Sequence, residues 1–166
     1  NEVGAEYPDV ATAYNHVDAA CIYFVQDPHR YDVIVTDNLF GDILTDLGGA
    51  VSGGIGVASS ANLNPARTGP SMFEPVHGSA PDIAGKGIAN PIGQIWSGAL
   101  MLDFLGHKDA GDAIVKAIER VLADKDSPRT PDLGGKATTT DLGKAIAAAH
   151  TDGFVRDAVG ERDFIN

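Results

Sequence analysis

Apolar residues in the first fifty positions alternate between two kinds of pattern. Residues 10–14 and 32–36 are short runs of β-tolerant side chains, which predict strands. Apolar positions from 17 to 25 recur at helical spacing until Asp27-Pro28, and a second helical pattern begins near Asn38. Strand, helix, strand and helix at these intervals indicate parallel βαβ units. We therefore expect an α/β fold with a mixed or parallel sheet and flanking helices.

Glycines interrupt this pattern at 52–56, where we place a domain boundary. Three segments follow from this boundary: a first domain over 1–52, a second over 53–150, and a polar tail over 151–166 that we expect to be poorly ordered. In the second domain the pattern predicts a loop over 62–70, a strand over 72–76, and helices over 91–105, 109–123 and 139–149.

Local features refine the three predicted helices. Ala113, Ile114, Ala117, Val121 and Leu122 form one apolar stripe on the second of them. Thr140 and Asp141 are candidate caps for the third helix. Trp96 is expected to pack in the core rather than stack on a ligand.

Charge and cysteine content exclude several classes of protein. Twelve basic residues stand against 23 acidic ones, for a formal charge of −11. Nucleic acids and anionic membranes attract clustered Lys and Arg, so neither is an expected partner. The single cysteine, Cys21, permits no internal disulfide, and no apolar run reaches membrane-spanning length. With no signal peptide at the start of the sequence, these features predict a cytoplasmic protein.

Asp42 and Asp46 are the first candidate for chemistry. Four residues apart on a helix, both carboxylates project from one face, where like charges are unfavourable unless a cation lies between them. A hard divalent cation prefers such oxygen ligands, and the apolar neighbours predict incomplete solvation of the pair. The commoner alternative is a solvated acidic face. Asp18 has two interpretations as well: a helix N-cap, or a third carboxylate for the same cation.

Residues 73–91 are the second candidate, because they mix glycines, prolines and polar side chains as ligand loops do. Gly78 and Ala80 would let a flat ring or a pyrophosphate approach the backbone closely. An irregular surface loop is an equally good interpretation of this composition. His77 alone is more often a structural hydrogen-bonding group than a catalyst.

Together, residues 36–46 and 73–91 strongly resemble the metal-dependent decarboxylating dehydrogenases of β-substituted 2-hydroxy acids, the isocitrate/isopropylmalate dehydrogenase superfamily. The resemblance runs from about residue 7 to about residue 150 and implies an isopropylmalate dehydrogenase-like fold. Residues 60–68, 95–106 and 130–139 are closer to the tartrate and D-malate dehydrogenase branch. 3-Isopropylmalate dehydrogenase of leucine biosynthesis is the near alternative, because it shares both main motifs.

The resemblance implies oxidative decarboxylation of D-malate or tartrate with NAD and Mg²⁺ or Mn²⁺. Asp42 and Asp46 would hold the cation, and Asp18 would reach it from the partner subunit of a homodimer with a shared active site. Asp18 and Asp42 would thus be catalytic through the metal. A carboxylate at Asp82 would favour NAD over NADP, because it accepts hydrogen bonds from ribose hydroxyls and repels a 2′-phosphate. The implied cofactor-binding residues are Asn38, Glu74, His77, Gly78, Ala80, Asp82 and Asn90.

Family members are longer than these 166 residues, and the resemblance covers only their carboxyl-terminal half. The amino-terminal half carries the catalytic lysine that acts as general base, and no residue here matches it. We therefore expect an incomplete fold, a truncated or proteolysed piece that belongs with its complementary half, and no activity from the piece alone. A non-catalytic nucleotide-binding subunit is the rival interpretation from another class.

Overall fold

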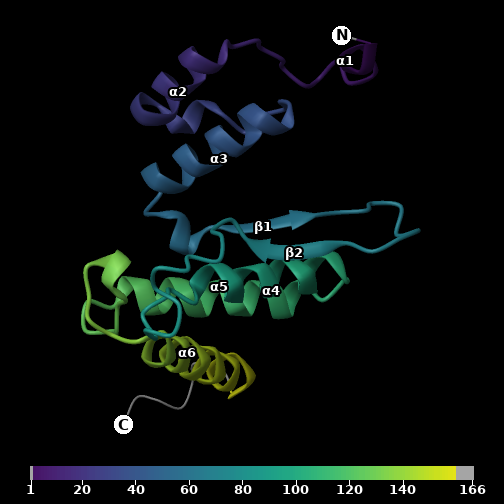
Figure 1. The fold of residues 1–166 in the computed structure, drawn as a ribbon. Helices are drawn as coiled ribbons and strands as arrows, with labels where there is room; N and C mark the ends of the chain where they lie inside the picture. Colours follow the sequence, from purple (N-terminus) through teal and green to yellow (C-terminus); the bar gives the residue numbers. More distant parts are fainter. Residues whose placement is uncertain (1, 160–166) are drawn as a thin grey trace. The chain divides into compact units, whose positions relative to one another are not determined.

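The computed structural model describes residues 2–159, with side chains as far as Thr151 (Figure 1). The chain divides into two compact units, Asn1–Val51 and Ser52–Asn166. We call them the amino-terminal and carboxyl-terminal units and describe each by itself.

The amino-terminal unit is helical. It contains α1 (Glu2–Glu6), α2 (Val17–Gln26), the short 3-10 helix η1 (Pro28–Arg30) and α3 (Asn38–Val51). Helices α2 and α3 pack together and bury Ala20 and Leu44. Gly48 permits this close approach, because a Cβ there would lie 3.0 Å from the Phe24 ring. The predicted helices over 17–25 and from Asn38 are confirmed, whereas α1 was not predicted.

The predicted strands over 10–14 and 32–36 are wrong for this unit. Both segments lack regular secondary structure, and the side chains of Val33 and Val35 are 83% and 93% exposed. A β-strand exists only when its backbone pairs with a neighbour, and the described part of the unit supplies no neighbouring strand. β-Propensity alone therefore leaves these segments unpaired, and no parallel βαβ unit forms among the described residues.

The carboxyl-terminal unit stacks a β-hairpin and three helices (Figure 1). Strands β1 (Ser59–Asn62) and β2 (Met72–Pro75) pair antiparallel, with Ser59 opposite Pro75 and Asn62 opposite Met72. The hairpin packs on α4 (Ile92–Phe104), α4 on α5 (Lys108–Ala123), and α5 on α6 (Thr139–Val159). Two 3-10 helices complete the unit, η2 (Ile55–Val57) and η3 (Pro131–Leu133). The strand over 72–76 and the helices over 91–105 and 109–123 are confirmed within a residue or two.

The core of this unit lies between α4, α5 and α6. Its buried members come from all three helices, and Ile114 and Leu122 pack against their edge. This arrangement confirms the predicted apolar stripe of α5. Trp96 is different: its side chain is 36% exposed, so the expectation that it packs in the core is wrong for the described chain. The buried set is Ile92, Ala117, Ile118, Val121, Leu142 and Ile146.

Helix α6 begins with a reciprocal cap. The Thr138 hydroxyl accepts the Asp141 backbone N–H at 3.2 Å, and the Asp141 carboxylate accepts the Thr138 N–H at 3.0 Å and its hydroxyl at 2.7 Å. The prediction is thus right for Asp141 and wrong for Thr140. The helix also continues to Val159, ten residues past the predicted end, and so includes the first part of the predicted polar tail, whose degree of order stays a prediction. Its remaining part, 160–166, lies outside the described residues.

These hydrogen bonds give the stability of the unit a dependence on pH. They hold the pKa of Asp141 below its ordinary value of 3.8, chiefly through the Thr138 hydroxyl. A carboxyl group whose pKa is lower in the folded than in the unfolded state stabilises the fold fully at pH values above its unfolded-state pKa. This contribution is lost as the pH falls through its folded-state pKa. We expect Asp141→Ala to lower the urea midpoint at pH 7 and to lower it less at pH 3. An equal loss at both pH values would contradict this account.

None of the helices that the structure describes is long and apolar enough to cross a membrane.

Candidate functional site

The acidic pair lies on the outer face of α3. The Asp37 carboxylate accepts the Phe40 N–H at 3.1 Å and so caps the helix, which places Asn38 at its first position. Asp42 and Asp46 follow one turn apart, and both residues are exposed. The expectation of incomplete solvation is therefore wrong: Leu44 turns inward toward α2, while the carboxylates face outward.

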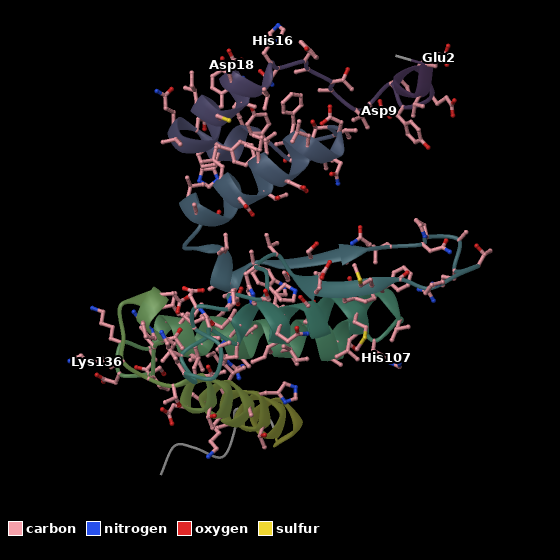
Figure 2. All side chains as sticks on the ribbon, in the orientation of Figure 1. Glu2, Asp9, His16, Asp18, His107 and Lys136 are labelled. Atoms are coloured by element: carbon pink, nitrogen blue, oxygen red, sulfur yellow. The ribbon has the colours of Figure 1, made fainter. Side chains whose placement is uncertain are left out.

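Two exposed carboxylates at this spacing have the donor chemistry for a hard divalent cation, which takes oxygen ligands and retains water. The fit is partial, because no group of three or more Asp, Glu, His or Cys side chains gathers at a metal-binding distance within the described residues. Asp18 lies in the first turn of α2, where its carboxylate accepts the Ala19 N–H at 2.8 Å (Figure 2). The N-cap of α2 is His16, so the N-cap interpretation of Asp18 is wrong. Its reach to a cation from a second copy stays a prediction.

The second candidate site is the stretch 76–91, which we call the nucleotide loop. It connects β2 to α4 without forming a helix or strand, and Glu74 lies exposed on β2 just before it. His77 is half-buried, with Nδ1 3.0 Å from the Gly78 carbonyl oxygen. Ala80 has a φ of +39°, a strained value for a residue with a side chain, and its carbonyl accepts the Ile83 N–H at 3.0 Å. Asp82 lies exposed within this turn.

The fit of the loop to a nucleotide rests on its open backbone. A Cβ added at Gly78, Gly85 or Gly87 would meet nothing within 4 Å. Ligand atoms can therefore approach the main chain there, as they do in phosphate- and ring-binding loops. Six of the seven predicted cofactor residues lie on β2 or in this loop, and Asn38 lies in the amino-terminal unit.

The end of the loop is tied to distant parts of the chain. Thr139, at the start of α6, donates its N–H to the Gly87 carbonyl at 2.8 Å and its hydroxyl to the Ala89 carbonyl at 2.5 Å. The side chain of Asn90 is used inside the protein: Nδ2 donates to Asp132 Oδ2 at 2.8 Å, and Oδ1 accepts the Ile92 N–H at 2.9 Å. Asn90 therefore holds the end of the loop in place, and its predicted contact with a cofactor stays a prediction.

Asp37, Asp132 and Thr139 are residues that sequence reasoning did not assign to either site. An Asp directly before a helical pattern is an N-cap signal, so Asp37 was accessible from the sequence. Asp132 and Thr139 lie 42 and 50 residues from their loop partners, and no local pattern indicates such contacts. Lys136 lies exposed in the segment before α6 (Figure 2).

The sequence is similar to known proteins of one family. The model of the isocitrate/isopropylmalate dehydrogenase family matches residues 1–146. A 3-isopropylmalate dehydrogenase of Mycolicibacterium paratuberculosis is 57% identical over 148 residues, which are 89% of this chain and 42% of that protein. A decarboxylating D-malate dehydrogenase of Escherichia coli is also 57% identical, over 145 residues that are 84% of this chain and 40% of that protein. Identity therefore does not separate these two branches.

Solved structures give the same assignment. The isocitrate dehydrogenase of Methylococcus capsulatus superposes with a TM-score of 0.85 at 44% identity, over 90% of this chain and 43% of that one. An apo β-decarboxylating dehydrogenase of Thermococcus kodakarensis gives 0.81 at 42% identity, over 98% and 46%. The chain thus spans less than half of the length of these relatives. Its fold is part of the expected isopropylmalate dehydrogenase-like fold. The chain belongs to the isocitrate/isopropylmalate dehydrogenase family.

Proposed function

We propose that the whole protein oxidatively decarboxylates a 2-hydroxy dicarboxylate with NAD⁺ and Mg²⁺ or Mn²⁺. This chain contributes the acidic pair and the nucleotide loop. The observation that carries the proposal is the exposed Asp42–Asp46 pair, set one turn apart on a helix that Asp37 caps. The high identity to decarboxylating dehydrogenases supports the same conclusion.

The residues of this chain bind and orient the reactants. Asp42 and Asp46 offer carboxylate oxygens on one face of α3, with Asn38 one turn before Asp42. The loop from His77 to Asn90 receives the nucleotide on its backbone. When bound, the cation would supply Lewis acidity to the substrate hydroxyl, and NAD⁺ would accept the hydride. The base that takes the hydroxyl proton comes from outside these residues in our proposal, so the 166 residues alone should form no NADH.

The exposed apolar side chains of the amino-terminal unit indicate a protein partner. Most of the exposed large apolar side chains of the described chain belong to it, among them Ile22, Val25 and Ile43 on α2 and α3. Large exposed apolar surfaces mark contacts with other chains. We propose a homodimer whose active site is shared, with Asp18 of one copy beside the acidic pair of the other. The acidic charge and the single cysteine favour a cytoplasmic location, without nucleic acid or membrane partners.

The preferred substrates are D-malate and tartrate, with 3-isopropylmalate as the alternative. NADH formation by the whole protein, measured at 340 nm with each of the three in turn, distinguishes them. A kcat/KM highest for D-malate or tartrate supports the preferred assignment, and one highest for 3-isopropylmalate supports the alternative. No NADH from any of them, with NAD⁺ still bound, would instead indicate a non-catalytic nucleotide-binding subunit.

Asp82 is expected to set the choice of cofactor. Its exposed carboxylate would accept hydrogen bonds from the ribose hydroxyls of NAD⁺ and repel the 2′-phosphate of NADP⁺. The protein should therefore use NAD⁺ in preference to NADP⁺. Replacing Asp82 by asparagine removes the repulsion and should raise the NADP⁺/NAD⁺ ratio of kcat/KM by about 10-fold or more. The exposed Asp126, replaced in the same way, is the control. An NADP⁺ preference in the unaltered protein would refute the assignment.

A further inference from the structure

We propose that Asp132 is a positioning residue for the nucleotide loop, acting through Asn90. The inference rests on the proposed function of the loop as the nucleotide site. Asn90 is 8% exposed, and its amide makes hydrogen bonds at both ends. One bond reaches Asp132 in η3, and the other reaches the first residue of α4, so Asn90 fixes the loop to two elements at once.

One side of this pair is lined by the backbone of η2. At Gly56, in η2, an added Cβ would lie 2.7 Å from Asp132 Oδ2 and 3.1 Å from Asn90 Cβ. Gly56 therefore lies against the Asn90–Asp132 hydrogen bond on one side, while Asp132 is exposed to solvent. Thr130 is fully buried, and its backbone carbonyl accepts hydrogen bonds from the Leu133 and Gly135 N–H groups at 3.0 Å. These bonds stabilise the η3 turn that carries Asp132. Asp132 thus meets Asn90 from a turn whose own backbone is fixed.

A hydrogen bond between a carboxylate and an amide is charge-assisted and stronger than a neutral one. Without its acceptor, the Asn90 amide would lose one of its two hydrogen bonds, which orient the last residues of the loop together with those of Thr139. The loop would then sample positions that do not fit a nucleotide, and the apparent affinity would fall with the fraction of fitting conformers. Asp132 needs no contact with the nucleotide to have this effect.

Two variants test the role from different directions. Asp132→Ala removes the acceptor, and Gly56→Ala wedges a methyl group into the pair without changing charge. Their controls are Glu119→Ala, an exposed carboxylate on α5, and Gly98→Ala, where a Cβ meets nothing within 4 Å. NAD⁺ affinity is measured by calorimetry, and amide hydrogen exchange of residues 83–90 is measured without nucleotide, both on the whole protein.

We expect both variants to weaken NAD⁺ binding by about 3- to 10-fold, the range for one hydrogen bond. They should also speed exchange over 83–90 while α5 keeps its protection, and the controls should change neither. Asp132→Asn, which keeps an acceptor oxygen, should restore most of the protection. Unchanged exchange over 83–90 in Asp132→Ala would overturn the positioning role, whether or not NAD⁺ binds. Failure of the unaltered whole protein to bind NAD⁺ would count against the proposed function, while the exchange data still decide the role of Asp132.

Discussion

Replacing Asp42 by asparagine is expected to lower kcat/KM of the whole protein by at least ~100-fold at a fixed Mn²⁺ concentration. The substitution keeps the size and the exposure of the side chain on α3 but removes one of the negative charges that would hold the cation. Because the site would bind metal less tightly, raising Mn²⁺ should recover part of the loss. Metal titrations of activity measure both effects.

The control for this prediction is Asp32→Asn, an exposed carboxylate of the same unit that lies outside α3. It should leave the Mn²⁺ dependence unchanged. Circular dichroism should show the same helix content in both variants. An Asp42→Asn protein with full activity and an unaltered metal requirement would remove the acidic pair from the mechanism.

Replacing Leu142 by alanine is expected to destabilise the carboxyl-terminal unit by about 2–5 kcal/mol. Leu142 is fully buried, in the core cluster that also contains Ile92 of α4 and Ala117 of α5. Its truncation loses apolar burial and leaves a cavity between α6 and the other helices. Urea unfolding followed by circular dichroism measures the change in the free energy of unfolding.

Leu63→Ala is the matched control, because Leu63 is 50% exposed in the loop between β1 and β2. A surface substitution of this kind should change the free energy of unfolding by no more than about 0.5 kcal/mol. If Leu142→Ala and Leu63→Ala lower the free energy of unfolding equally, Leu142 does not lie in the core of the folded protein.

The helices were predictable from the sequence because a helix carries its signal within one turn. The stripe on α5 and the stop at Asp27-Pro28 are local, and the structure follows them. Strands depend on partners elsewhere in the chain. The run at 32–36 has the β-propensity of a strand but no neighbour in the described unit, whereas β1, made of small residues, pairs with β2. Trp96 was misjudged for a related reason, because burial depends on tertiary neighbours.

The candidate site divides in the same way. The spacing of Asp42 and Asp46 and the composition of the nucleotide loop were visible in the sequence, and the structure adds their exposure. The hydrogen bonds from Asp132 to Asn90 and from Thr139 to Ala89 join residues at least 42 positions apart. No sequence pattern indicates such pairs, and they give Asn90 a structural task in addition to the ligand contact that the sequence predicts for it.

The central claim is that this family member couples oxidation of a hydroxy acid to loss of its carboxylate. Simultaneous measurement of NADH and CO₂ from the whole protein tests it most directly, with D-malate, tartrate or 3-isopropylmalate, NAD⁺ and Mn²⁺. The account predicts one CO₂ for each NADH with at least one of these substrates, and loss of both products when EDTA removes the metal. NADH without CO₂, or neither product from any of the three, would contradict it.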